Sequence, residues 1–340
     1  MDYQTLVAIE KANGKNCRAC KDCNGLACRG ECPGVGGFGN GDSFVNNRKA
    51  LKKYQIVMDV INGANTIDPS TRLFGHHLST PILVAPISGI KANYDIDMSE
   101  QEYFHEMIQA CCDVGTVAFG GDGVNIDYFE SPLKQIHDHA GQGIPTMKPW
   151  VDQGIQLRRS LLDQHDYMAL AMDIDSAGLP ALQHADIPVE CKSVDQLKKV
   201  KQYLGDKPFI LKGIISVQGA LKAVEAGVDG IIISNHGGRV NEDSVGTMDM
   251  VEAIVEAVKG KLTIFVDGGF RSGTDVFKAL ALGCDGVLIG RPFTLACATA
   301  RQEGVKTLYN HYKDELVHTM KMCGCATIGD ITKDKVIKVG

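Results

Sequence analysis

The segments AGVDGIIIS (residues 226–234) and LGCDGVLIG (residues 282–290) repeat one pattern, and this pattern indicates the fold. In each, a glycine ends a stretch of helical periodicity, an Asp-Gly pair turns the chain, and a run of apolar residues follows. Apolar runs without polar alternation are typical of parallel strands that are covered on both faces. The two segments end at residues 234 and 290, which leaves room for two strand–helix units between them.

Further runs of the same kind extend through the chain after residue 80. They are PILVAPIS (81–88), GTVAFGG (115–121), GIPTMKPW (143–150), YMALAMDID (167–175), PFILKG (208–213), GIIISNH (230–236), TIFVDGG (263–269) and GVLIGRPF (286–293). Amphipathic segments such as SVQGALKAVEAG and TDVFKALALG lie between them. Eight strands, most followed by a helix, predict an α/β fold, a closed (β/α)8 TIM barrel. A doubly wound open sheet is the alternative, although no phosphate-binding glycine loop follows the first run.

The first 40 residues differ from the rest of the chain. They contain a cluster of cysteines and lead into GVGGFGNGDSFVNNR (34–48), a glycine-rich polar stretch that we interpret as a loop. A segment below about 40 residues rarely folds without a metal or disulfides. We therefore expect a Cys-rich N-terminal extension at residues 1–40 and a single barrel domain at residues 41–340.

The overall composition is that of a globular protein, with 44% hydrophobic and 22% charged residues. A net charge of −6 and the lack of a basic run argue against nucleic acid or an anionic membrane as a partner. The apolar runs are too short to span a membrane. Because the start of the chain also lacks the basic and apolar regions of a secretory signal, we expect a cytoplasmic protein.

Ionisable and polar side chains gather where the predicted strands end. The candidates are Ser88, Lys148, Trp150, Asp173, Lys212, His236, Arg239, Asp267, Arg271 and Arg291. In a barrel, the carboxyl ends of all strands meet at one face, and active sites lie there. A single charged residue at a strand end is usually a solvated loop residue, but this many at one rim predict a site that binds a small-molecule substrate.

The last two runs end in DGGFRSG and GRPF, which have the composition of an anion site. Glycines allow the backbone N–H groups to approach an anion, and an arginine completes the charge pairing. We expect Gly268, Gly269, Arg271, Gly290 and Arg291 to form a phosphate cradle, for either a substrate or a cofactor. Ordinary turns with surface arginines are the alternative.

A histidine followed by two glycines ends the sixth run. His236 is suited to accept a proton at neutral pH, and Asp173 could orient it. Lys212 could stabilise an anionic intermediate or cofactor. A lone histidine is more often structural, so the catalytic interpretation depends on its position among the other strand ends.

The motifs LKGI, SNHGGR, DGGFRSGTDVFKALALG, GRPF and GCATIGDI resemble those of the FMN-dependent 2-hydroxy-acid oxidases and dehydrogenases. The resemblance is strong from about residue 192, looser through residues 44–175 and absent before about residue 34. It implies FMN as the cofactor, His236 as the catalytic base, Asp173 as the partner of His236, and Arg239 as the anchor of the substrate carboxylate. It also implies a homo-oligomer, a tetramer or larger.

The resemblance further implies which residues contact the flavin. Lys212 would neighbour the flavin N1 and O2 edge, and Lys148 stands where a glutamine usually meets the ring. The complete implied cofactor set is Pro86, Ile87, Ser88, Lys148, Lys212, Ser234, Asp267, Gly268, Gly269, Arg271, Gly290 and Arg291.

The chain departs from the family pattern at the substrate. The family usually supplies two tyrosines and a second arginine. Here the first tyrosine falls in CPGVGG (32–37), Trp150 replaces the second as a substrate-binding residue, and IDSAGLPAL (174–182) has no arginine. We therefore predict oxidation of a small 2-hydroxy acid to the 2-oxo acid, without naming the acid. The alternatives are a non-redox FMN enzyme resembling type 2 isopentenyl-diphosphate isomerase, against which SNHGGR argues, and a flavin- or metal-loaded sensor without turnover.

Five of the twelve cysteines fall within sixteen residues, at Cys17, Cys20, Cys23, Cys28 and Cys32. Because disulfides are uncommon in the cytosol, such a cluster indicates metal binding or redox chemistry. The spacing partly matches a ferredoxin run, so an iron–sulfur cluster, a zinc site and a metal-free thiol patch all remain open. An iron–sulfur centre would imply a dehydrogenase with an electron-transfer partner.

Overall fold

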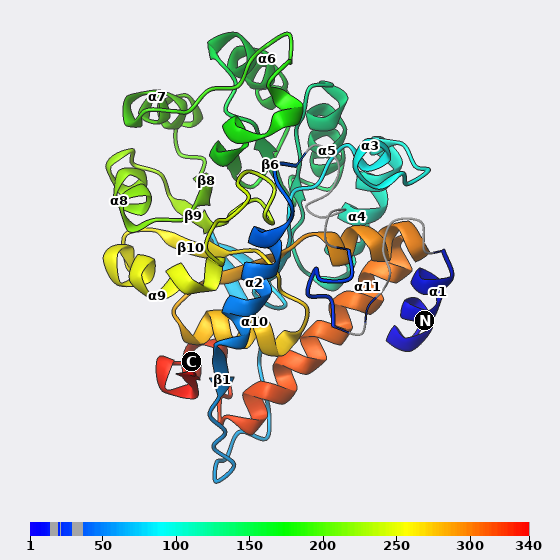
Figure 1. Cartoon of the computed structure of the whole chain (residues 1–340), viewed down its shortest axis with the longest axis vertical. Coiled ribbons are helices and arrows are strands. Elements are labelled where there is room, and N and C mark those ends of the chain that lie inside the picture. Colours follow the sequence, from blue (N-terminus) through cyan, green and yellow to red (C-terminus); the bar gives the residue numbers. More distant parts are fainter. Residues whose placement is uncertain (14–19, 21, 29–36, 340) are drawn as a thin grey trace.

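In the computed structural model, which describes residues 1–13, 20, 22–28 and 37–339, eight parallel strands form a closed barrel (Figure 1). The strands are β4 (Ile82–Val84), β5 (Phe119–Gly120), β6 (Ile144–Met147), β7 (Leu170–Asp173), β8 (Phe209–Ile214), β9 (Gly230–Ile233), β10 (Thr263–Val266) and β11 (Gly286–Ile289). They pair in the order β4-β11-β10-β9-β8-β7-β6-β5. A parallel bridge between Val84 and Ala118 joins the two ends, so the predicted barrel is confirmed and the open sheet is excluded.

The barrel has two apolar layers that alternate along each strand. Leu83, Ile210, Ile232, Phe265 and Leu288 belong to one buried cluster, which fills the interior. Their neighbours on the same strands belong to a second cluster, which packs against the helices. Both faces of each strand are therefore buried, and this explains why the sequence shows continuous apolar runs.

Each strand of the barrel is followed by a helix on the outer surface. These are α4 (Glu100–Val114), α5 (Asp127–Asp138), α6 (Asp152–Leu162), α7 (Val194–Leu204), α8 (Val217–Glu225), α9 (Thr247–Val258), α10 (Gly273–Ala281) and α11 (Arg291–Met322). Serines begin several of them: the Ser216 hydroxyl accepts a hydrogen bond from Gly219 N, and the Ser272 hydroxyl accepts one from Asp275 N. The loops before these two helices are short, whereas long connections follow β4, β7 and β9.

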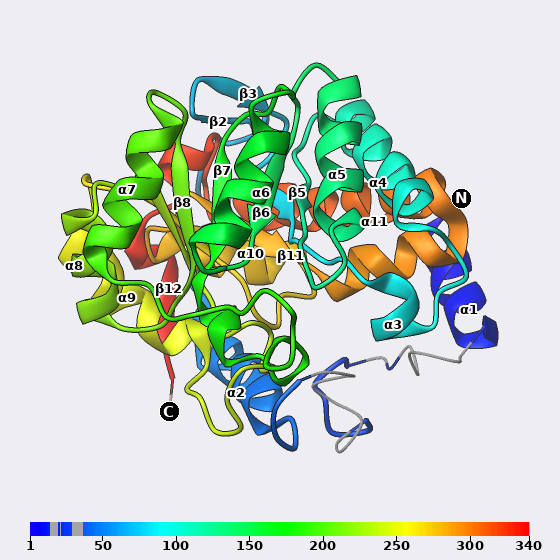
Figure 2. The same cartoon turned by 90° about the horizontal axis from the view of Figure 1, so that it is seen from above.

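Smaller elements close the remaining surfaces. They are α1 (Tyr3–Asn13), α2 (Asp42–Lys52), β1 (Tyr54–Ile56), β2 (Thr71–Leu73), β3 (His76–Leu78), α3 (Ile90–Tyr94), four 3-10 turns, η1 (Ile174–Gly178), η2 (Pro180–Leu182), η3 (Ile328–Asp330) and η4 (Lys333–Lys335), and β12 (Val336–Lys338). Figure 2 shows α1 beside α11, where the Tyr3 ring stacks on His311 with centroids 3.7 Å apart. The described helices include none long and apolar enough to cross a membrane.

Residues 22–28 of the N-terminal extension pack on α2. Asp22 forms an ion pair of 2.6 Å with Lys52, and Gly25, at a φ of +84°, lies against the Phe44 ring. A β-carbon at Gly25 would stand 2.4 Å from that ring, so the close approach requires glycine. Cys17 and Cys32 lie outside the described residues.

Candidate active site

A pocket opens at the carboxyl ends of the strands, where the sequence predicts the site. Most of the predicted residues line it: Pro86, Ile87, Ser88, Lys148, Asp173, Lys212, His236, Arg239, Asp267, Gly268, Gly269, Arg271, Gly290 and Arg291. Ser234 and Trp150 do not. The strand ends therefore gather these side chains around one space, as barrel topology requires.

The loops after β10 and β11 form the end of the pocket that contains the arginines. Gly268 and Gly269 have φ values of +98° and +86°, a left-handed conformation that favours glycine. Arg271 Nη1 donates to the Phe270 carbonyl at 2.7 Å, whereas its buried Nε has no acceptor within the described residues. The Arg291 guanidinium stacks 4.5 Å above the Phe44 ring. Two fixed guanidinium groups and glycine-lined loops make this end suitable for an anion.

The cysteine segment reaches the same end of the pocket. Burial works against the charged form of Arg271, but interaction with the Cys23 side chain raises the pKa of this guanidinium. Asp22 adds a carboxylate 3.6 Å from Arg48 of α2, the helix that also carries Phe44. The segment therefore packs against the arginine-rich loops.

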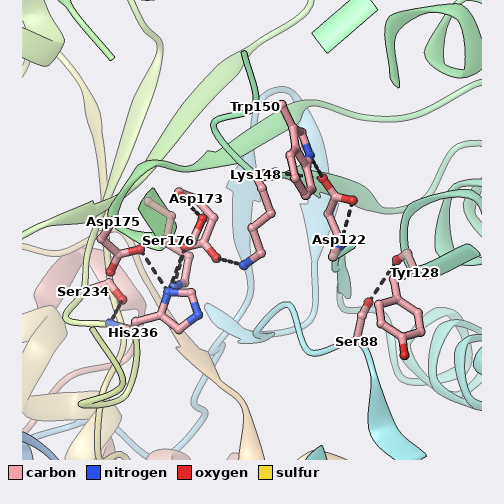
Figure 3. A network of polar contacts seen from close by, with 12 residues as sticks. Ser88, Asp122, Tyr128, Lys148, Trp150, Asp173, Asp175, Ser176, Ser234 and His236 are labelled. Carbon is pink, nitrogen blue, oxygen red and sulfur yellow. Dashed lines mark hydrogen bonds and ion pairs between the residues drawn. The ribbon is translucent and has the colours of Figure 1, made fainter. Parts of the chain in front are cut away.

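Asp173 at the end of β7 is enclosed by cations (Figure 3). Its carboxylate accepts hydrogen bonds from Lys148 Nζ at 2.6 Å and from Lys212 Nζ at 3.0 Å. Burial alone would raise the pKa of Asp173, but the surrounding cations hold it well below its usual value. Burial likewise opposes the charge of Lys212, yet the neighbouring carboxylates raise its pKa. Both groups are therefore charged in the folded protein.

His236 occupies a turn of unusual backbone conformation. Its φ is +59°, in the left-handed region, and Gly237 and Gly238 continue in that region with φ values of +63° and +83°. A non-glycine residue rarely adopts this conformation unless the surroundings impose it. Here Asn235 anchors the turn through paired amide hydrogen bonds of 2.8 and 2.9 Å to Asn47 of α2.

The His236 ring faces two carboxylates, and the nearer one is not the residue that the sequence indicated. Nδ1 lies 2.9 Å from Asp175 Oδ1 and 3.4 Å from Asp173 Oδ1. Asp173 is thus within ion-pair distance, but Asp175 is the hydrogen-bond partner. The predicted run reached residue 175, but only Asp173 was chosen from it; η1 turns the chain so that Asp175 also faces the histidine. In the sequence, the aspartate two positions after Asp173 was the feature that could have identified this partner.

The assignments of Ser234 and Trp150 need correction. The Ser234 side chain is fully buried, and its hydroxyl accepts a hydrogen bond from His236 N at 3.1 Å, so it supports the turn and does not line the pocket. The Trp150 indole is also buried and donates to Asp122 Oδ2 at 2.6 Å. Trp150 therefore supports the pocket wall from behind and does not replace a substrate tyrosine. Asp122, which the sequence analysis missed, pairs at 2.8 Å with the buried Arg158.

The remaining wall combines Arg239 with aromatic and amide side chains. Arg239 Nη2 donates to Asn93 Oδ1 at 3.1 Å, and burial lowers the pKa of this guanidinium. Tyr94 of α3 and Tyr128 of α5 also line the pocket. Neither tyrosine was among the predicted site residues, because both lie away from the two positions that supply tyrosines in the resembling family.

Comparison with known proteins gives a consistent result. The model of the family described as FMN-dependent dehydrogenase matches residues 35–181 and 183–338. A peroxisomal (S)-2-hydroxyacid oxidase of Arabidopsis thaliana is 28% identical over 337 residues, covering 88% of this chain and 90% of the relative. Glycolate oxidase 5 of Oryza sativa subsp. japonica is 29% identical over 331 residues, covering 86% of each chain. The crystal structure of a mandelate oxidase superposes with a TM-score of 0.76 at 28% identity, covering 88% of this chain and 91% of that chain.

Proposed function

The chain belongs to the FMN-dependent dehydrogenase family, and we propose that it oxidises a small 2-hydroxy acid to the corresponding 2-oxo acid. The relatives that match over most of both chains are 2-hydroxyacid and glycolate oxidases, and the structural neighbour is a mandelate oxidase. The single observation that carries the proposal is the pocket itself. It brings His236, Arg239 and Lys212 together beside the arginine-rich loops.

The residues present fit FMN. The unpartnered Nε of Arg271 and the glycines at positions 268, 269 and 290 suit a phosphate, which Arg271 and Arg291 would hold. Lys212, whose charge is stabilised by neighbouring carboxylates, would stand at the ring. Pro86, Ile87, Ser88 and Lys148 line the same pocket and would lie along the flavin. When bound, FMN supplies the two-electron acceptor for the oxidation.

The side chains of this chain would perform the remaining steps. Arg239 would bind the substrate carboxylate as a planar fork of donors. Because Nδ1 of His236 is engaged by a carboxylate, Nε2 is the ring atom left to accept a proton. That proton comes either from the hydroxyl group or from the α-carbon of the substrate. Asp173 and Asp175 would then stabilise the imidazolium that forms.

The proposal is tested by anaerobic mixing of the purified protein with a panel of 2-hydroxy acids. We expect a yellow protein that releases FMN, not FAD, on denaturation, and whose visible absorbance bleaches with at least one acid. Bleaching by none of them, with FMN bound, would favour a non-redox FMN enzyme or a sensor. Colourless protein that takes up no flavin on reconstitution would contradict the whole proposal.

We also propose that at least three of Cys17, Cys20, Cys23, Cys28 and Cys32 bind a metal centre, either an iron–sulfur cluster or zinc. In support, Cys20 and Cys23 are in no disulfide within the described residues. The segment between them offers little apolar surface, so metal ligation would supply the energy that orders it. An iron–sulfur centre would further imply an electron-transfer partner.

Elemental analysis of protein purified without oxygen tests the metal site. We expect iron with sulfide, or zinc, in the wild type and a large loss of that metal in Cys20→Ser/Cys23→Ser, because two ligands are removed. Cys191→Ser, an exposed cysteine outside the cluster, is the matched control and should retain the metal. Metal-free wild-type protein with an unchanged fold in the double variant would leave only the thiol-patch interpretation.

Two further proposals concern the setting of the protein. A cytoplasmic location is supported by the cysteines of the barrel, which form no disulfide within the described residues, as expected in a reducing compartment; they are Cys111, Cys112, Cys191, Cys284, Cys297, Cys323 and Cys325. A homo-oligomer is supported by an exposed apolar loop. Val57, Met58, Val60 and Ile61 there are between 42% and 96% exposed, and such patches often mark protein contacts.

A further inference from the structure

We infer that Asp175 is a further positioning residue, which orients His236 beside Asp173 and stabilises the protonated form of the histidine. This inference rests on the proposed function, in which His236 is the base. Its starting point is the difference between the two contacts of Nδ1, 2.9 Å to Asp175 Oδ1 and 3.4 Å to Asp173 Oδ1. Only the shorter one has the length of a normal hydrogen bond.

Asp173 is already committed to other partners. Its Oδ2 accepts from Lys148 Nζ, and its Oδ1, the atom that is nearer to His236, accepts from Lys212 Nζ at 3.0 Å. The carboxylate of Asp173 is therefore shared between His236 and two ammonium groups. Lys148 matters here because it gives Asp173 a second lysine partner besides Lys212.

Asp175 has the complementary arrangement. Its Oδ1 meets His236 Nδ1, while its buried Oδ2 has no hydrogen-bond partner within the described residues. Its one ion pair within the described part of the chain is the contact with His236. A largely buried carboxylate with one close partner concentrates its electrostatic effect on that partner, because little water screens it.

The chain reserves space for this contact. Gly213 of β8 has a φ of +103°, and a β-carbon there would stand 2.5 Å from Asp175 Cγ. The Ser176 hydroxyl donates to the Asp173 carbonyl at 2.6 Å and thereby holds the turn that carries Asp175. On the other side, the left-handed backbone of His236 aims the ring. The glycine at position 213, the Ser176 hydrogen bond and the left-handed backbone of His236 thus all favour the hydrogen bond between Asp175 and His236.

The charges around His236 give this bond a chemical role. Three carboxylates lie near the ring: Asp173 of β7, Asp175 of η1 and Asp267 of the loop after β10. The nearby cations are Lys212 of β8, which pairs with Asp173, and Arg291, whose Nη2 donates to the carbonyl of Gly237. Lys212 makes ion pairs with Asp173 and Asp267, whereas it interacts with Asp175 electrostatically but without an ion pair in the described residues. Asp175 therefore supplies the negative charge nearest to Nδ1, which fixes the Nδ1–H tautomer and favours the imidazolium.

The test compares Asp175→Asn with Asp173→Asn and with Asp186→Asn, an exposed aspartate of the same strand–helix loop. The readout is the pH dependence of flavin reduction by an active 2-hydroxy acid. Asp175→Asn should lower the limiting rate by about 10- to 100-fold. It should also move the midpoint of the acidic limb to lower pH, because losing a nearby negative charge favours neutral imidazole. Asp186→Asn should behave as wild type.

A second readout does not depend on turnover. The protein is prepared with isotopically labelled histidine, and the NMR signal of His236 is identified as the one that is missing from His236→Gln. The pH at the midpoint of the titration of this signal should be lower in Asp175→Asn than in the wild type. A fall in Asp173→Asn with no change in Asp175→Asn would overturn the inference. If no acid reduces the wild-type flavin, the proposed function fails, and the titration alone then decides which aspartate holds the histidine.

Discussion

His236→Ala is expected to keep FMN and to lose substrate-driven flavin reduction. The change removes the proposed base from the pocket but leaves the loops after β10 and β11, with Arg271 and Arg291, in place. Loss of general acid–base catalysis typically costs about 10²- to 10⁴-fold in rate. Anaerobic stopped-flow mixing with an acid that bleaches the wild type measures this rate directly.

A second histidine provides the control. His139 is part-buried and hydrogen-bonded to the carbonyl of Gln135 and to Gln109, but it does not line the pocket. His139→Ala should therefore reduce its flavin at the wild-type rate. Near-wild-type reduction in His236→Ala would show that this histidine has only a structural role, in which its hydrogen bond to Asp175 steadies the turn.

The sequence predicted the barrel because burial on both faces leaves a strong signature. All eight predicted runs coincide with a barrel strand, and seven of the strands are shorter than their runs; β8 has the length of its run but ends one residue later. The run PILVAPIS, for example, forms a strand only over Ile82–Val84, and Pro86, Ile87 and Ser88 lie beyond it as pocket lining. The apolar character continues past the strand because the loop also packs against other residues of the pocket.

The same reasoning predicted strand-end residues better than loop residues. Asp173 and Lys212 lie on neighbouring paired strands, so the barrel alone brings them together. Asp175 is placed by a 3-10 turn, and the His236 ring by a left-handed backbone that Asn47 of a distant helix supports. Such conformations depend on contacts far apart in the sequence, and no local pattern encodes them.

The pocket tyrosines and Trp150 illustrate the same limit. Tyr94 and Tyr128 reach the pocket from α3 and α5, so a search at the positions used by the resembling family could not find them. Trp150 follows a strand but turns its indole toward Asp122, because the buried carboxylate needs donors and Arg158 supplies only some of them. The hydrogen-bonding demand of one buried group thus decides where a large side chain points.

Arg239→Lys is expected to raise the KM for the 2-hydroxy acid by about 10- to 150-fold, with FMN retained. A guanidinium binds a carboxylate through two parallel hydrogen bonds, whereas an ammonium is a point charge that cannot reproduce this geometry. A lost charge-assisted hydrogen bond costs about 1.5–3 kcal/mol. The effect should be large because Arg239 is oriented by Asn93 in a wall where the sequence supplies no second arginine after Asp173.

Steady-state kinetics of Arg239→Lys, compared with those of Arg271→Lys, distinguish substrate binding at one end of the pocket from FMN binding at the other. Arg271 lies in the loop after β10, near Cys23, and its exchange for lysine should weaken FMN retention while the reconstituted enzyme keeps its KM. Arg239→Lys should show the opposite pattern, because its guanidinium lies beside Asn93 and not in that loop. An unchanged KM in Arg239→Lys, with normal FMN content, would mean that other groups of the wall bind the carboxylate. Tyr94 and Tyr128 would then be the side chains to exchange next, because both line the same pocket.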